Sequence, residues 1–133
     1  MANIAASATY TITNWQESAF SEAQGAGKLT RASVRKQYKG DIDGEGVLEF
    51  VMAYNPDGSA VYTGFERVTG SVSGKTGSFV LRHEGTFQAG TARTKMEIVP
   101  DSGTDELRGM RGEGKEANSH GQEMNTSLDY WFE

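Results

Sequence analysis

The strongest constraint on this chain is a strict alternation of side-chain types, which runs through its second half and is interrupted by glycines. In the stretch GSFVLRHEGTF, Phe79 and Leu81 alternate with Val80, Arg82 and Glu84. A period of two residues is typical of a strand with one buried face. The stretch TARTKMEIV repeats the pattern. Short strands separated by glycine-rich turns predict an antiparallel all-β protein.

The same pattern, read along the whole sequence, predicts eight strands. These are Ala8–Trp15, Leu29–Tyr38, Gly46–Tyr54, Ala60–Ser71, Gly77–Phe87, Gly90–Val99, Glu106–Lys115 and Ser119–Phe132. Closure into a barrel would remove the exposed edges of such a sheet. We therefore predict a closed eight-stranded antiparallel barrel, with residues 1–133 forming a single domain. The segment Gln16–Gly27 lacks the alternation and is predicted to be a loop that can hold one helical turn around Ser18–Ala23.

Two turns fix how the central strands align. Asn55-Pro56-Asp57-Gly58 has proline and glycine where a tight turn favours them. If Gly70–Gly77 closes its hairpin symmetrically, Glu66 lies opposite Leu81 and diagonal to His83. These side chains then share the inner wall of the barrel.

Composition limits the classes of function. The sequence has no cysteine, so disulfides and thiolate zinc sites are excluded, which fits a reducing cytoplasm. The N-terminal residues show neither a basic region nor a long apolar run, so we expect no signal peptide and no membrane anchor. A net charge of −5 argues against nucleic-acid binding. One basic cluster is interpreted as the solvated face of a strand, with a functional patch as the alternative; it comprises Lys28, Arg31, Arg35, Lys36 and Lys39.

The predicted inner wall combines apolar residues with a few polar groups, as small-molecule pockets do. Its candidate ligand-binding residues are Tyr54, Tyr62, Phe79, Met96 and Tyr130. Glu66 and His83 are the candidate catalytic residues. A carboxylate on an apolar wall should either have a raised pKa or take a partner. A Glu66 with a raised pKa would suit proton transfer next to a carbonyl, and a tyrosine could stabilise the developing oxyanion.

A purely structural interpretation of the same residues stays open. Glu66 and His83 would then form a satisfied buried pair, or Glu66 would bind an arginine such as Arg111 near one end of the barrel. No metal site is predicted, because His83 and His120 lie on different elements without ligand spacing. No cofactor is expected either, since the glycines of GMRGEG at residues 109–114 precede no helix and indicate a turn.

The stretches LTRASV, GDIDGEGVLEFVMAY, GFERVTGSVSGKTGSFVLRHEGTF and VPDSGTDELRGMRGEG resemble a family of small uncharacterised bacterial proteins. The barrel of that family is similar to plant allene oxide cyclase, of the calycin-like and dirigent group. The resemblance implies an eight-stranded antiparallel barrel, a homo-oligomer, and isomerase or cyclase chemistry on an apolar substrate. The acid that the plant cyclases carry on their first strand has no counterpart in Tyr10-Thr11-Ile12-Thr13-Asn14.

Three functions therefore compete. The first is an isomerase or cyclase that acts on an apolar, lipid-like or polyketide-like compound inside the barrel. The second is a carrier without chemistry, and the third is a structural homo-oligomer with a filled interior. Apolar residues on the outer face, among them Val61 and Phe65, favour self-association.

Overall fold

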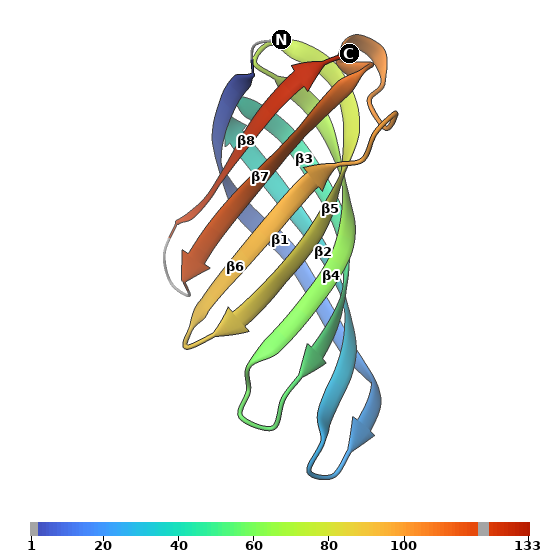
Figure 1. The fold of residues 1–133 in the computed structure, drawn as a ribbon, viewed down its shortest axis with the longest axis vertical. Helices are drawn as coiled ribbons and strands as arrows, with labels where there is room; N and C mark the ends of the chain where they lie inside the picture. The colour runs from blue at the N-terminus through green and yellow to red at the C-terminus, as the bar shows by residue number, and fades with distance from the viewer. Residues whose placement is uncertain (1–2, 120–122) are drawn as a thin grey trace.

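The computed structural model describes residues 3–119 and 123–133, which form one closed antiparallel barrel of eight strands. Each strand pairs with its neighbours in sequence, and the last strand pairs with the first (Figure 1). The strands are β1 (Ile4–Ala23), β2 (Gly27–Gly40), β3 (Ile42–Tyr54), β4 (Ala60–Val72), β5 (Lys75–Gln88), β6 (Thr91–Ile98), β7 (Met110–Ser119) and β8 (Met124–Phe132). The predicted fold class is confirmed. His120 lies outside the described residues.

The alternation of side chains places the two faces as predicted. Glu66 pairs with Leu81 across β4 and β5, and the turn between these strands consists of Ser73 and Gly74 in the left-handed region of φ. Along β3 the even-numbered residues Leu48, Phe50 and Met52 are buried, whereas the odd-numbered residues between them are exposed. The hairpin therefore has the register that the turn chemistry implied.

The first hairpin is longer than predicted, and the prediction of a loop at Gln16–Gly27 is wrong. β1 continues to Ala23 and pairs with β2 as far as Ala23 and Gly27. From Thr11 to Ala23 every residue of β1 is exposed, because this part of the hairpin projects beyond the barrel wall. A strand without a buried face has no reason to alternate, so its backbone pairing leaves no pattern in the sequence.

The connection before β7 also differs from the prediction of a strand starting at Glu106. Asp105–Leu107 form a single 3-10 turn, η1, and β7 starts at Met110. Leu107 is buried beneath this turn, and the Thr104 amide donates to the Ser78 carbonyl oxygen. No helix within the described residues is long and apolar enough to cross a membrane.

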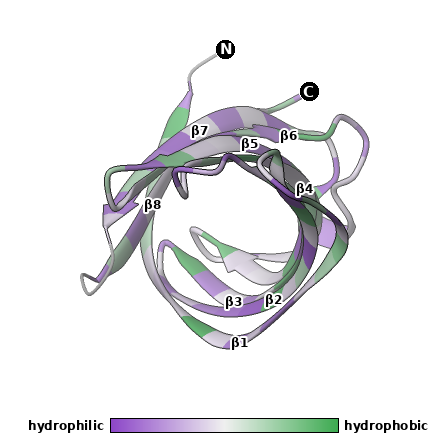
Figure 2. Ribbon diagram, turned by 90° about the horizontal axis from the view of Figure 1, so that it is seen from below, coloured by the Kyte–Doolittle hydropathy of each residue, from purple (hydrophilic) through white to green (hydrophobic). Residues whose placement is uncertain are grey.

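The two ends of the barrel differ. Both termini lie at one end of the barrel (Figure 1), and buried apolar side chains form a core cluster in that half. This packed core includes Ile42, Val72, Phe79, Ile98, Leu107, Met110 and Tyr130. At the other end the hairpins extend to unequal lengths, and the end-on view shows the ring of strands around the interior (Figure 2). The interior is therefore filled in one half, and the other half holds the cavity described next.

Candidate functional site

A cavity of about 330 Å³ lies inside the barrel, toward the end away from the termini. Most of its wall is apolar or aromatic: Ile12, Trp15, Val34, Phe50, Met52, Tyr54, Tyr62, Phe87, Ala92 and Met124. The polar groups of the wall are Tyr10, Lys36, His83, Thr94, Glu116, Asn118 and Ser119. An apolar cavity with a few convergent polar groups is the usual form of a small-molecule site.

Glu66 lies behind His83, a residue of the cavity wall, and is fully buried, with 0 % of its surface exposed. Its Oε1 lies 2.7 Å from His83 Nε2 and 3.4 Å from Lys36 Nζ. Its Oε2 accepts a hydrogen bond of 2.5 Å from the Tyr38 hydroxyl. Three strands, β2, β4 and β5, thus contribute to one polar cluster in which both Glu66 oxygens have partners.

This cluster keeps the Glu66 carboxyl ionised. Burial alone would raise its pKa, but the Lys36 ammonium and the hydrogen bonds from His83 and Tyr38 outweigh burial and lower the pKa to about 2. Burial and the neighbouring Glu66 charge raise the pKa of Tyr38, so this phenol stays a donor. Of the two outcomes expected from the sequence, a raised pKa or a partner, the structure shows partners, and these lower the Glu66 pKa. Arg111 is not its partner but lies near Asp101 and Glu133.

Lys36 also corrects an interpretation made from the sequence, because it is not part of a solvated face. It is only 5 % exposed, and its ammonium lies 4.3 Å from the centre of the Tyr10 ring. The residues around it in β2 alternate, so that Val34, Lys36 and Tyr38 point inward while Arg35 points outward. An inward lysine is tolerated because Glu66 compensates its charge.

His83, like Lys36, is a residue of the cluster that lines the cavity. Its Nε2 bonds to Glu66, whereas its Nδ1 has no hydrogen-bond partner among the described residues. The ring is only 1 % exposed, and Phe50 packs edge-on against it with 5.8 Å between centroids. With Glu66 as the acceptor at Nε2, the imidazole presents Nδ1 as its second polar atom.

A second polar group lies on the wall formed by β1 and β7. Glu116 Oε2 accepts hydrogen bonds of 2.5 Å from the Tyr10 hydroxyl and of 2.5 Å from Asn118 Nδ2. Burial and the Glu116 charge raise the pKa of Tyr10, which therefore remains a donor. Within residues 3–119 and 123–133, Glu116 Oε1 has only a contact of 3.5 Å with the Thr126 hydroxyl. This oxygen has room for a further donor.

A third carboxylate, Glu17, fixes the aromatic rim of the cavity. It accepts hydrogen bonds from Tyr54 at 2.7 Å, Thr30 at 2.7 Å and Trp15 Nε1 at 3.1 Å. Although partial burial opposes ionisation, these donors lower its pKa. Trp15 and Tyr54 both line the cavity, so Glu17 holds two side chains of the rim in place.

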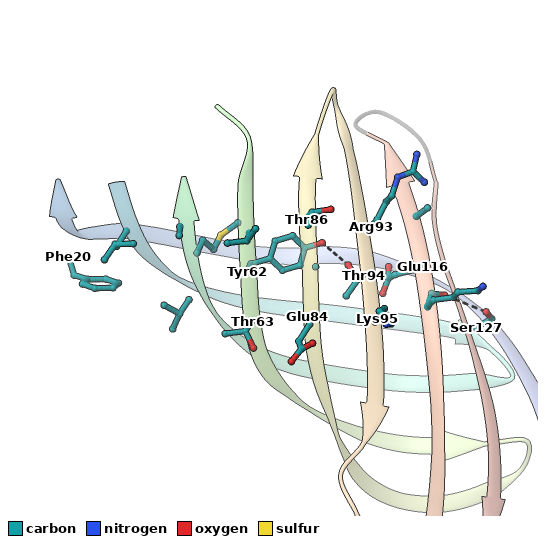
Figure 3. A pocket seen from close by; sticks show the side chains of 18 residues that line it. Phe20, Tyr62, Thr63, Glu84, Thr86, Arg93, Thr94, Lys95, Glu116 and Ser127 are labelled. Carbon is teal, nitrogen blue, oxygen red and sulfur yellow. Dashed lines mark hydrogen bonds between the residues drawn. The ribbon is translucent and has the colours of Figure 1, made fainter. Parts of the chain in front are cut away.

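A wider hollow of about 1240 Å³ covers part of the outer surface and reaches the rim (Figure 3). Its lining mixes outward residues such as Thr63 and Lys95 with inward ones such as Tyr62. Figure 3 shows the Tyr62 phenol reaching Thr94, a hydrogen bond of 2.7 Å, with Glu116 nearby. Because this hollow is open to solvent, we place the candidate site in the inner cavity.

The residues predicted for the site separate into two groups. Tyr54, Tyr62 and His83 line the cavity, and Glu66 lies directly behind His83. Phe79, Met96 and Tyr130 belong to the packed core and are not among the residues that line the cavity. All of them point inward as expected, but the alternation of a strand does not reveal which end of the barrel is filled.

The comparison with known sequences gives the family. A family described as "Protein of unknown function (DUF3224)" matches residues 6–130. The chain belongs to the DUF3224 family.

A crystal structure of a protein of unknown function from the DUF3224 family, from Shewanella oneidensis MR-1, has the same fold. The TM-score is 0.85 with 28 % sequence identity, and the match covers 98 % of each chain. A search of curated proteins finds no match. The likeness thus establishes fold and family, and the argument about function rests on the site of this DUF3224 protein itself.

Sequence reasoning missed several polar residues of this DUF3224 site, among them Lys36, Tyr38, Glu116 and Asn118. Lys36 and Tyr38 both lie on β2, two strands away from Glu66 on β4, and alternation along β2 would have placed them inside. Glu116 and Asn118 lie beyond Lys115, where the predicted strand ended. Continuing the alternation of Gly112 and Gly114 by two and four residues places both side chains on the inner face.

Proposed function

We propose that this protein binds a small, mostly apolar molecule in the open half of its barrel. The observation that carries the proposal is the cavity of about 330 Å³, whose aromatic wall ends at buried ionisable groups. Filling such a space with a ligand removes apolar surface from water, which is the main driving force for binding in a preformed cavity. A structural barrel needs no such cavity, since side chains can fill an eight-stranded interior.

A fluorescent probe tests this proposal without knowledge of the natural ligand. N-phenyl-1-naphthylamine is uncharged, and its emission rises when it leaves water for an apolar site. We expect saturable binding by the wild-type protein. The Ala92→Trp variant should weaken it at least about tenfold, because Ala92 lines the cavity and an indole there occupies the ligand's space.

The neighbouring residue offers the matched control. Arg93 is exposed and lies on the opposite face of β6, so Arg93→Trp adds the same side chain outside the cavity. This variant should bind the probe like the wild type. Equal weakening by both variants, or no saturable binding by the wild type, would contradict the proposal.

Acid–base catalysis is a second candidate, supported by the pairing of Glu66 with His83. A carboxylate that holds one imidazole nitrogen orients the other as a general base. We propose that Nδ1 removes a proton from carbon next to a carbonyl group, leaving an enolate to which a proton returns, as an isomerase or cyclase requires. The resemblance to allene oxide cyclases supports the same class of chemistry. Because the ring is 1 % exposed, a substrate reaches Nδ1 only if a neighbouring side chain such as Phe50 moves.

Hydrogen–deuterium exchange separates a catalyst from a carrier. 2-Tetralone is an apolar ketone whose α protons exchange in D₂O when a base removes them. A catalyst should accelerate this exchange well above the rate given by free imidazole at equal concentration. His83→Gln, which can still donate to Glu66 but has no basic nitrogen, should abolish the acceleration. Exchange no faster than with imidazole would favour the carrier.

A further inference from the structure

Glu116 has a carboxylate oxygen that the protein leaves almost unused. Its two short hydrogen bonds, from Tyr10 and Asn118, both end at Oε2. Among the described residues, Oε1 has only the Thr126 contact of 3.5 Å. An ionised carboxylate offers about four acceptor positions, so Oε1 can accept a strong hydrogen bond from a ligand. Glu116 is one of the residues that line the cavity.

The orientation of this carboxylate is fixed by the backbone. Asn118 Oδ1 accepts a hydrogen bond of 3.0 Å from the Asn125 amide, and Asn118 Nδ2 lies 3.3 Å from the Asn125 carbonyl oxygen. The amide nitrogen of Asn118 is thereby directed at Glu116 Oε2. The carboxylate is held before any ligand arrives, which reduces the entropic cost of binding.

The charged groups at the cavity carry a net negative charge. With histidine counted as neutral, Glu116 is the one carboxylate and Lys36 the one ammonium among the described residues of the lining, and the Glu66 carboxylate lies behind His83. Lys36 is already bonded to Glu66. Among the described residues Glu116 forms no salt bridge. A bound cation would balance this charge, whereas a carboxylate ligand would be repelled.

The aromatic wall favours the same kind of ligand. Trp15, Phe50 and Tyr54 line the cavity, and aromatic faces attract a cation by their quadrupole. The same rings offer an apolar surface for the rest of the molecule. Carboxylate and aromatic rings together are suited to a compact apolar body that carries one ammonium group.

We propose that the ligand of this cavity is an apolar amine, bound as an ammonium ion that donates to Glu116 Oε1. This rests on the proposed function, because it names the chemical class of the molecule that the cavity binds. A neutral alcohol could also donate to Oε1, but it would leave the negative charge unbalanced.

Four naphthalene derivatives with one ring system and different substituents test the proposal. They carry an aminomethyl, a hydroxymethyl, a methyl or a carboxylate group at position 2, and each is measured at neutral pH by displacement of N-phenyl-1-naphthylamine. We expect the aminomethyl compound to bind about tenfold more tightly than the methyl compound, as a charge-assisted hydrogen bond should give. The carboxylate should bind most weakly.

The outcomes separate this inference from the proposed function. Binding of the methyl compound with no advantage for the amine overturns the inference and leaves the binding function intact. Equal affinity for hydroxymethyl and aminomethyl compounds, or tightest binding of the carboxylate, also overturns it. If none of the four compounds and no fluorescent probe binds, the proposed function itself fails.

One variant pair assigns the preference to Glu116. Glu116→Gln removes the charge and exchanges one acceptor oxygen for a donor nitrogen, so the tenfold preference for the amine should disappear. Glu113→Gln makes the same change on the exposed face of β7 and should keep it. Thermal melting of both variants checks that they fold. If Glu116→Gln does not fold, the ranking of the four compounds on the wild-type protein still decides the proposal.

Discussion

The Tyr38 hydroxyl reaches the Glu66 carboxylate across an intervening strand, over Gly46. Tyr38 lies on β2 and Glu66 on β4. Between them on β3, Gly46 pairs with Lys36 and Val68, which are each two residues from Tyr38 and Glu66 along their strands. A Cβ at Gly46 would lie only 2.0 Å from Glu66 Oε2 and 3.0 Å from Tyr38 Cε2. The glycine is thus needed here for space and not for its backbone angles.

Gly46→Ala should therefore destabilise the protein. The added methyl group displaces a buried carboxylate that is held by three partners, so we expect a loss of about 1–3 kcal/mol in the free energy of unfolding. Urea denaturation followed by circular dichroism measures it. Glu45→Ala, at the exposed preceding position, should change the free energy by less than about 0.5 kcal/mol. A Gly46→Ala variant as stable as the wild type would show that the cluster adjusts freely.

Glu66 and Lys36 should be strongly coupled. Glu66→Gln leaves the buried Lys36 ammonium without its carboxylate partner. Lys36→Met leaves the buried Glu66 carboxylate without its ammonium partner. Each single change should cost about 3 kcal/mol of stability, whereas the double variant should cost clearly less than their sum. A double-mutant cycle from urea denaturation gives the coupling free energy. Additive effects would mean that the ion pair contributes nothing of its own.

The cluster explains which part of the site the sequence could predict. Alternation along β4 and β5, with the turn chemistry between them, was enough to bring Glu66 and His83 together inside. Lys36 was misassigned because it stands in a run of basic residues, where composition suggested solvent although its position in β2 pointed inward. Whether an inward side chain meets the cavity or the packed core depends on the stagger of all eight strands. Phe79 and Tyr130 could therefore not be separated from Tyr62 by the period alone.

The ionised Glu66 should make the free energy of unfolding depend on pH at acidic pH. Its pKa falls from its ordinary value of 4.5 to about 2 in the folded protein. A carboxyl whose pKa is lower in the folded state stabilises that state above the unfolded pKa, and the contribution is lost as the pH falls toward the folded pKa.

This pH dependence is measured as the difference in stability between the wild type and Glu66→Gln. Because the variant resembles the protonated side chain, the difference should be constant near pH 7 and shrink between about pH 4.5 and pH 2. Urea midpoints at several pH values provide the measurement, and the subtraction removes the contributions of the other carboxylates. A difference that does not change over this range would contradict the assignment of the charge.

Glu17 should control the rim of the cavity without supporting the fold. Its carboxylate bonds to Trp15 and Tyr54, both of which line the cavity, but it lies on the exposed part of β1. Glu17→Ala should weaken binding of N-phenyl-1-naphthylamine by about two- to fivefold, because two rim side chains gain freedom, as loss of preorganisation predicts. The melting temperature should hardly change. Glu22→Ala, farther along the same exposed strand segment, is the control, and equal binding by both variants would exclude this role.

Self-association is the remaining prediction, and the outer face of β4 is where we expect the contact. Val61 is 54 % exposed and Phe65 is 57 % exposed, and Val51 is also exposed on the adjacent strand. Covering these side chains removes apolar surface from water. Sedimentation velocity at micromolar concentration should therefore give a multiple of the chain mass of 14.4 kDa.

Phe65→Asp should shift the mass toward that of one chain, whereas Thr69→Asp, on the same face but outside the apolar patch, should not. A wild-type protein that sediments as one chain would rule out this interface at that concentration.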